Sequence, residues 1–182
     1  FDAEIKILLN STKKAVNEFV TVGDKEVKIE VEAGPYIKVQ AGNEKDPASL
    51  EILGQKLSTV FSFEQVQTDK GTKIVRISLE NTSLFLGDDN GTGLELSKGR
   101  GALIVTAQGV AGKFEITSEI KNVDSVTFEG LMSLEINTTG VTVNERVDGK
   151  ELILEAGPYL RASALDTTIT LAGVTLTGDF AF

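Results

Sequence analysis

The residues best suited to chemistry lie in one short loop, where Asp88, Asp89 and Asn90 stand between glycines in the sequence GDDNGTG. Their side chains offer hard oxygen ligands, which Ca²⁺ prefers in proteins. The spacing of an EF-hand loop, with its closing bidentate Glu, is absent, and so is the nonapeptide calcium repeat. Because Asp, Asn and Gly also favour turns, a hairpin loop is the favoured interpretation, and these three residues are the candidate calcium ligands.

The rest of the sequence is poor in catalytic residue types, since it contains neither His nor Cys. That composition excludes a Ser-His-Asp triad, a thiolate nucleophile and most transition-metal sites. The many Asp and Glu residues mostly occupy alternating polar positions, which is typical of a solvated strand face. We therefore predict that the chain is not an enzyme and has no cofactor, and a polysaccharide hydrolase with paired carboxylates ranks last.

The charge of the chain restricts its partners. With 27 acidic and 18 basic residues the net charge is −9, which opposes binding to nucleic acid and to anionic membrane surfaces. No apolar run approaches the roughly 18 residues of a membrane-spanning helix. We expect neither a nucleic-acid partner nor a membrane span.

The composition predicts an all-β fold with little or no helix. The chain is 41% apolar, contains 18 Gly and only 3 Pro, and its apolar residues are mostly Val, Ile, Leu and Phe. Such residues favour strands, and glycines favour the turns between them. Three segments, residues 102–116, 133–147 and 168–182, each predict a hairpin of two antiparallel strands.

An internal repeat organises the sequence. The nonapeptide VEAGPYIKV at residues 31–39 recurs as LEAGPYLRA at residues 154–162, and the flanking segments match in the same order. Residues 1–127 are therefore predicted to form one full module, and residues 128–182 a partial second copy equivalent to residues 1–63. Because both ends fall inside the period, we expect an internal piece of a longer protein, with neighbouring modules as partners.

The repeat also decides two ambiguous segments. Residues 4–20 and 47–63 have helical propensity, but their counterparts are rich in Thr and Val with Gly turns, so both are predicted to be strands. Between them, the alternation at residues 26–32 places Val27, Ile29 and Val31 on a buried face. No amphipathic helix is available to cover a sheet, so the strands are expected to form an elongated β-solenoid-like or sandwich-like array, or a closed-up groove.

The repeated EAGPY motif has two interpretations. An exposed Tyr36 and Tyr159 would form a repeated contact surface, since aromatic residues are enriched at binding sites. Alternatively, Gly and Pro interrupt strand pairing and each Tyr packs on the layer beneath. The second interpretation is favoured because it explains the residue types directly.

Several ordered motifs resemble modules of a known kind: VRISLENTSLFLGDDNGTGLELSKGRGALIVTAQGVAGKFE at residues 75–115, INTTGVTVNE at 136–145, GPYLRAS at 157–163 and LAGVTLTGDFAF at 171–182. They resemble tandem repeat modules of giant bacterial secreted or surface proteins, in RTX-type, haemolysin-like calcium-binding and adhesin-like arrays. The resemblance implies an extracellular or cell-surface location and a role in attachment, with a cell-surface ligand as a further partner. It implies no catalytic residue.

Two non-enzymatic functions follow as expectations. The first is a structural spacer or adhesion stalk, which needs no site and suits an acidic repeat. The alternative is a lipid- or ligand-binding β-groove, similar to the asymmetric-sheet lipid-transfer proteins. Its lining would come from the phenylalanines Phe61, Phe63, Phe114, Phe128, Phe180 and Phe182.

Overall fold

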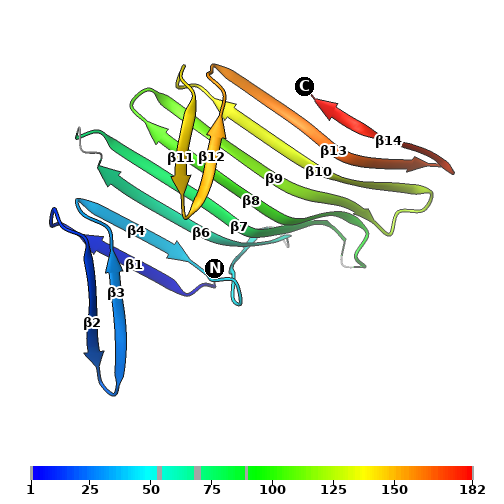
Figure 1. Ribbon diagram of the computed structural model, residues 1–182. Helices are drawn as coiled ribbons and strands as arrows, with labels where there is room; N and C mark the ends of the chain where they lie inside the picture. Colours follow the sequence, from blue (N-terminus) through cyan, green and yellow to red (C-terminus); the bar gives the residue numbers. More distant parts are fainter. Residues whose placement is uncertain (1, 53–54, 68–70, 89, 182) are drawn as a thin grey trace.

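The computed structural model describes residues 2–52, 55–67, 71–88 and 90–181, and in this part of the chain it confirms the all-β expectation (Figure 1). The described residues form strands, turns and loops without any helix, so no helix among them is long and apolar enough to cross a membrane. Residues 4–20 and 47–63, which have helical propensity, contain strands as their counterparts predicted.

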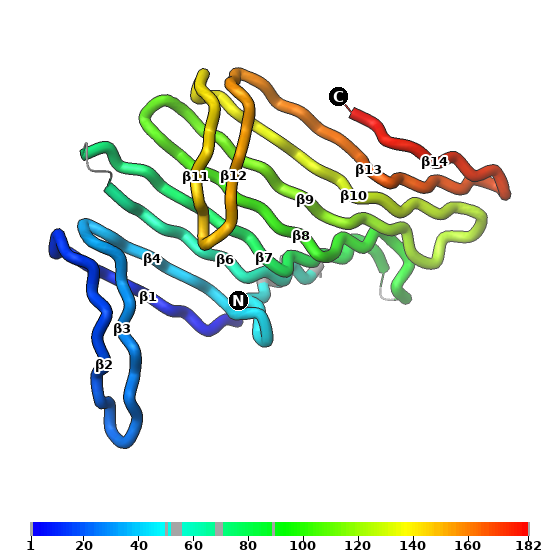
Figure 2. Tube along the Cα trace, viewed as in Figure 1, coloured from blue at the N-terminus to red at the C-terminus, as the bar shows by residue number. Residues whose placement is uncertain are grey.

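Most strands belong to one antiparallel sheet of ten strands, in the order β1-β4-β6-β7-β8-β9-β10-β13-β14, with β5 also paired to β6. Long strands joined by short turns lie side by side along this sheet (Figure 2). Its members are β1 (Ile5–Asn10), β4 (Tyr36–Ala41), β5 (Ala48–Ile52), β6 (Gln55–Gln67), β7 (Lys73–Gly87), β8 (Gly93–Thr106), β9 (Gly109–Lys121), β10 (Val126–Asn137), β13 (Tyr159–Leu171) and β14 (Val174–Ala181).

This sheet is open, with no closed or solenoid winding among the described residues, which differs from a solenoid-like array. The physical reason lies in the connections: each short turn returns the chain to the neighbouring position, so the sheet grows sideways. Bulges interrupt the register of the long strands, with Asn81 (φ 49°) and Lys98 (φ 54°) in the left-handed region. Bulges bend strands and increase their twist.

Two of the three predicted hairpins are confirmed, since β8 pairs with β9 and β13 pairs with β14. The third, at residues 133–147, is wrong. There β10 stays in the main sheet between β9 and β13, while β11 (Val143–Val147) leaves the sheet and pairs with β12 (Lys150–Leu154). The predicted module boundary between residues 127 and 128 falls inside β10, so the sheet runs through it without interruption.

One arrangement occurs twice: a sheet strand, a two-stranded hairpin outside the sheet, and the next sheet strand. It is formed by β1-β2-β3-β4, with β2 (Val16–Val22) and β3 (Lys25–Val31), and again by β10-β11-β12-β13. At the exit point, the side-chain amide of Asn137 donates to the carbonyls of Val141 (2.8 Å) and Glu155 (2.7 Å). Asn10 makes the equivalent bonds to Lys14 (2.8 Å) and Glu32 (2.7 Å).

The EAGPY glycines close this junction. A Cβ on Gly34 would collide with the backbone carbonyl of Asn10, and one on Gly157 with that of Asn137. Glycine therefore lets the returning strand pass directly against the exit point. Tyr36, 5% exposed, pairs with Asn10 in the sheet and donates to Glu64 (2.8 Å). This geometry agrees with the structural interpretation of the motif.

The second hairpin forms the largest apolar cluster described. It lies across the sheet over β6 to β9 (Figure 1), and its inner face buries Val143, Val147, Leu152 and Leu154. These side chains cluster with three residues of the sheet, Ile74, Ile104 and Ala111. Hydrophobic burial on this side of the sheet therefore depends on a hairpin from a later part of the chain.

The first hairpin has no such cover. It projects past β1, away from the sheet (Figure 1). Val27, Ile29 and Val31 do share one face, as the alternation predicted, but only Val31 is buried, and Val27 and Ile29 are 45% and 37% exposed. The expectation of a buried face is thus wrong for the outer part of this hairpin in the isolated chain.

Candidate functional site

The predicted calcium loop connects β7 and β8. Asp88 Oδ1 accepts hydrogen bonds from the backbone amides of Asn90 (3.0 Å) and Thr92 (2.9 Å). These bonds are those of a turn that an Asp side chain stabilises. Asp89 lies outside the described residues, and among the described residues no group of three or more acidic, His or Cys side chains could hold a metal. Calcium binding at Asp88, Asp89 and Asn90 stays a prediction.

A broad apolar surface covers the side of the sheet opposite the second hairpin, and we call it the apolar face. On β1 it carries Ile5, Ile7 and Leu9, which pair with Ala41, Val39 and Ile37 of β4. The alternation continues through Phe61 and Phe63 of β6, Ile77 and Leu79 of β7, and Met132 and Leu134 of β10. Several of these residues are strongly exposed: Ile7 66%, Leu9 68%, Leu134 45%, and Leu160 66% on β13.

A groove of about 220 Å³ lies in the middle of the apolar face. Two glycines shape it, because each faces a large side chain on the neighbouring strand: Gly101 pairs with Phe114, and Gly112 with Leu103. A Cβ on either glycine would come within 2.6 Å of that side chain. The rest of the lining is almost wholly apolar and includes Ile77, Leu79, Leu134 and Ile136. Such a surface suits an aliphatic chain or another apolar partner.

Of the phenylalanines expected in a groove, Phe114 of β9 lines it, and Phe61 and Phe63 lie on the same face on β6, three strands along the sheet. Phe128 pairs with Ile169, and Phe180, which is 43% exposed, pairs with Ala164. Phe182 lies outside the described residues. The strand alternation thus indicated an apolar face, whereas the glycines that open the groove had no recognisable sequence signal.

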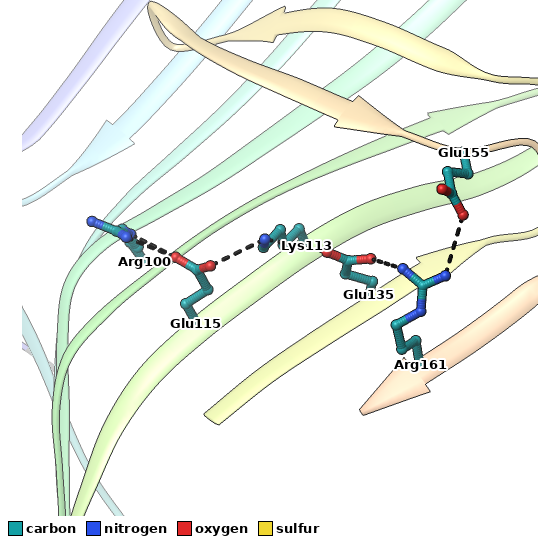
Figure 3. Close-up of polar contacts among 6 residues, drawn as sticks. All are labelled: Arg100, Lys113, Glu115, Glu135, Glu155 and Arg161. Atoms are coloured by element: carbon teal, nitrogen blue, oxygen red, sulfur yellow. Dashed lines mark hydrogen bonds and ion pairs between the residues drawn. The ribbon is translucent and has the colours of Figure 1, made fainter. Parts of the chain in front are cut away.

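The opposite face carries a row of ion pairs across β8, β9, β10 and β13 (Figure 3). Arg100 donates to Glu115 through Nε (2.9 Å) and Nη2 (2.8 Å). Lys113 joins Glu115 (3.1 Å) to Glu135 (3.2 Å), and the row continues through Arg161, whose contacts with Glu135 and Glu155 are both 3.2 Å. Cross-strand opposite charges of this kind stabilise strand pairing modestly.

The row keeps its charges at neutral pH. Burial raises the pKa of Glu115, but hydrogen bonds from Arg100 and Lys113 outweigh it, so the pKa lies below its ordinary value. Burial lowers the pKa of Lys113, but hydrogen bonds from Glu115 and Glu135 leave it above its ordinary value. A general acid needs the opposite shift, toward the working pH. Arg100, Lys113 and Glu115 line a cavity of about 350 Å³ under the second hairpin. In this cavity Glu115 and Lys113 are ion-paired, and the pKa of neither is shifted toward neutral pH.

No protein-family model, curated protein or solved structure matches this chain. Function is therefore inferred from geometry, and two features stand out in the described residues: the repeated strand–hairpin–strand unit and the apolar face. The sequence indicated through EAGPY and its flanks that a segment recurs, and the structure shows the strand–hairpin–strand arrangement of that segment. The sequence did not indicate that one hairpin is covered while its counterpart is not.

Proposed function

We propose that this chain is a non-enzymatic segment of an extended repeat array in a giant bacterial secreted or surface protein, where it acts as a structural spacer or adhesion stalk. In this proposal the array is elongated, extracellular, and built by lateral addition of strands to one sheet. Its partners are neighbouring modules and, at the cell surface, a ligand for attachment.

The observation that supports this proposal is the repeated unit within one continuous sheet. In the first copy Asp2 and Ser49 form an isolated antiparallel β-bridge. In the second copy the equivalent residues, Glu129 and Thr168, are paired between β10 and β13. The outer strands β1 and β14 each pair with one neighbour among the described residues, so both edges have free backbone groups. A unit that repeats sideways with open edges can extend indefinitely, which suits a spacer.

The test is to lengthen the chain by one period and measure its shape. Phe182 is the counterpart of Phe63, so a second copy of residues 64–182 placed after Phe182 continues the repeat in phase. It adds six main-sheet strands, and at about 4.8 Å per strand the sheet should become about 29 Å wider. Small-angle scattering measures this change. A compact particle whose longest dimension stays constant would contradict the proposal.

The apolar face favours a second candidate function, the binding of acyl chains. An uncovered apolar surface across many strands is unusual for a soluble protein and typically marks a binding site. The groove at Leu103, Phe114 and Leu134 would hold part of an aliphatic chain, and the neighbouring apolar residues would extend its track. A repeat array and an acyl-chain track are compatible, because added strands would lengthen the same face.

Replacing Leu134 with Asp should weaken the binding of a fluorescent fatty acid at least about ten-fold, because the change places a charge in the groove. Ile153→Asp is the matched control, since Ile153 is also exposed (64%) but lies on β12, on the opposite side of the sheet from the groove. Native mass spectrometry of chain purified without detergent tests for bound lipid. No probe binding, or equal weakening by both variants, would count against this function.

A further inference from the structure

We infer that the hairpin β2–β3 packs on the sheet of a second copy of the repeat unit. In that arrangement the second copy's strands equivalent to β6–β9 lie next to β1 and extend the sheet. The inference rests on the proposed array and adds the contact that holds one unit to the next. The partner is thus a surface of the same chemistry as the one under β11–β12.

The two hairpins match position by position. In β11–β12 the inner face carries the cross-strand pairs Val143–Leu154, Glu145–Leu152 and Val147–Lys150. In β2–β3 the equivalent pairs are Val16–Val31, Glu18–Ile29 and Val20–Val27. The apolar positions are retained, and Val27 replaces a lysine, so the first hairpin presents at least as much apolar surface as the second.

The two hairpins differ in how far their inner faces are buried. Val147 and Leu152 are 2% and 3% exposed, whereas their counterparts Val20 and Ile29 are 41% and 37% exposed. Beyond them, the first hairpin carries one further apolar residue on its inner face, Val22, which is 62% exposed and pairs with Lys25. A two-stranded hairpin with an apolar face is marginally stable alone in water, so this face requires a cover.

The polar contacts identify the cover. In the second copy, Glu145 accepts from Arg76 of β7 (3.1 Å), and the turn residue Asp148 accepts from Lys38 (2.5 Å) and Ser78 (3.1 Å). The first hairpin retains Glu18 at the position of Glu145 and has Asp24 in its turn. Glu18 therefore suits a sheet that carries the equivalent of Arg76, which lies on β7.

Geometry selects which copy provides that sheet. The second hairpin folds back over the strands that precede β10, and the first hairpin projects beyond β1, where the strands preceding β1 would lie (Figure 1). In this chain the β6–β9 surface is already covered by β11–β12. The partner is therefore a unit whose last strand, equivalent to β9, is free to pair with β1.

The experiment compares the 182-residue chain with the same chain preceded by a second copy of residues 55–127, which places Thr127 before Phe1 as it precedes Phe128. Hydrogen exchange should show β1 and the β2–β3 amides slowed by about a hundred-fold or more in the extended chain. Val20→Asp should lower the melting temperature of the extended chain by roughly 5–10 °C, and by less than about 1 °C in the 182-residue chain.

Phe19→Ser is the matched control, because Phe19 is 65% exposed on the other side of the same strand and should be neutral in both chains. If β1 becomes protected while β2–β3 stays unprotected and Val20→Asp is neutral, docking is overturned but the array stands. If β1 also stays unprotected, the added strands have not joined the sheet, and both the array and the docking are overturned.

Discussion

Replacing Leu152 with Ala is expected to lower the free energy of unfolding by about 2–4 kcal/mol, because the change leaves a cavity beneath the second hairpin. Leu152 is 3% exposed and belongs to the cluster that joins β11–β12 to β7, β8 and β9. In this cluster the hairpin supplies one side and the sheet the other, so a cavity weakens both. Urea denaturation followed by circular dichroism measures the effect.

The control for this substitution is the next residue. Ile153 is 64% exposed on the outer face of the same strand, and Ile153→Ala should change the free energy of unfolding by less than about 0.5 kcal/mol. Both variants remove similar apolar groups from one strand, so strand propensity affects them alike. Equal losses would mean that the hairpin is not packed on the sheet as described.

Replacing Asn137 with Ala should lower the free energy of unfolding by about 2–4 kcal/mol, because it removes four hydrogen bonds made by one buried side chain. Asn137 is fully buried, and its Oδ1 accepts from the backbone amide (2.9 Å) and the hydroxyl (2.8 Å) of Thr139. Together with the two bonds from its amide to Val141 and Glu155, these bonds fix the base of the second hairpin. Thermal and urea unfolding of the variant provide the measurement.

The first copy provides the comparison for Asn137. Asn10 makes the same four bonds, but the outer part of the hairpin that it fixes is uncovered among the described residues, so Asn10→Ala should cost about half as much or less. Asn137→Asp distinguishes the hydrogen bonds that Asn137 donates from those that it accepts. This variant can still accept the two bonds from Thr139 but cannot donate to the carbonyls of Val141 and Glu155. If Asn10→Ala and Asn137→Ala destabilise equally, the packing of the second hairpin adds nothing to the junction.

The sequence predicted local structure well where two copies could be compared. Residues 4–20 and 47–63 were assigned to strands against their helical propensity because their counterparts contain Thr-, Val- and Gly-rich segments, and the structure confirms this. The prediction of a hairpin at residues 133–147 was wrong for a specific reason. Thr138-Thr139-Gly140 has the composition of a hairpin turn, but Asn137 there binds two carbonyls of the next hairpin and directs the chain out of the sheet.

The apolar alternation shows a similar limit. It placed Val27, Ile29 and Val31 on one face, and they do share a face, but alternation carries no information about what lies opposite that face. The groove on the apolar face depends on Gly101 and Gly112, each beside a large residue of the neighbouring strand. The paired residues, Gly101 with Phe114 and Leu103 with Gly112, are 13 and 9 positions apart in the sequence. Which residues face each other is set by the register that the turn between β8 and β9 imposes.

The sequence by itself determined that this protein is built from antiparallel strands, that one segment recurs within it, and that Asn10 and Asn137, like the EAGPY glycines, hold equivalent places in the two copies. These are local properties, because period, turn residues and repetition can be read along the chain. Only the tertiary structure decided that the sheet is open, that one hairpin crosses it and that the other is uncovered. Those outcomes depend on contacts between distant residues, where packing and not local propensity selects the partner.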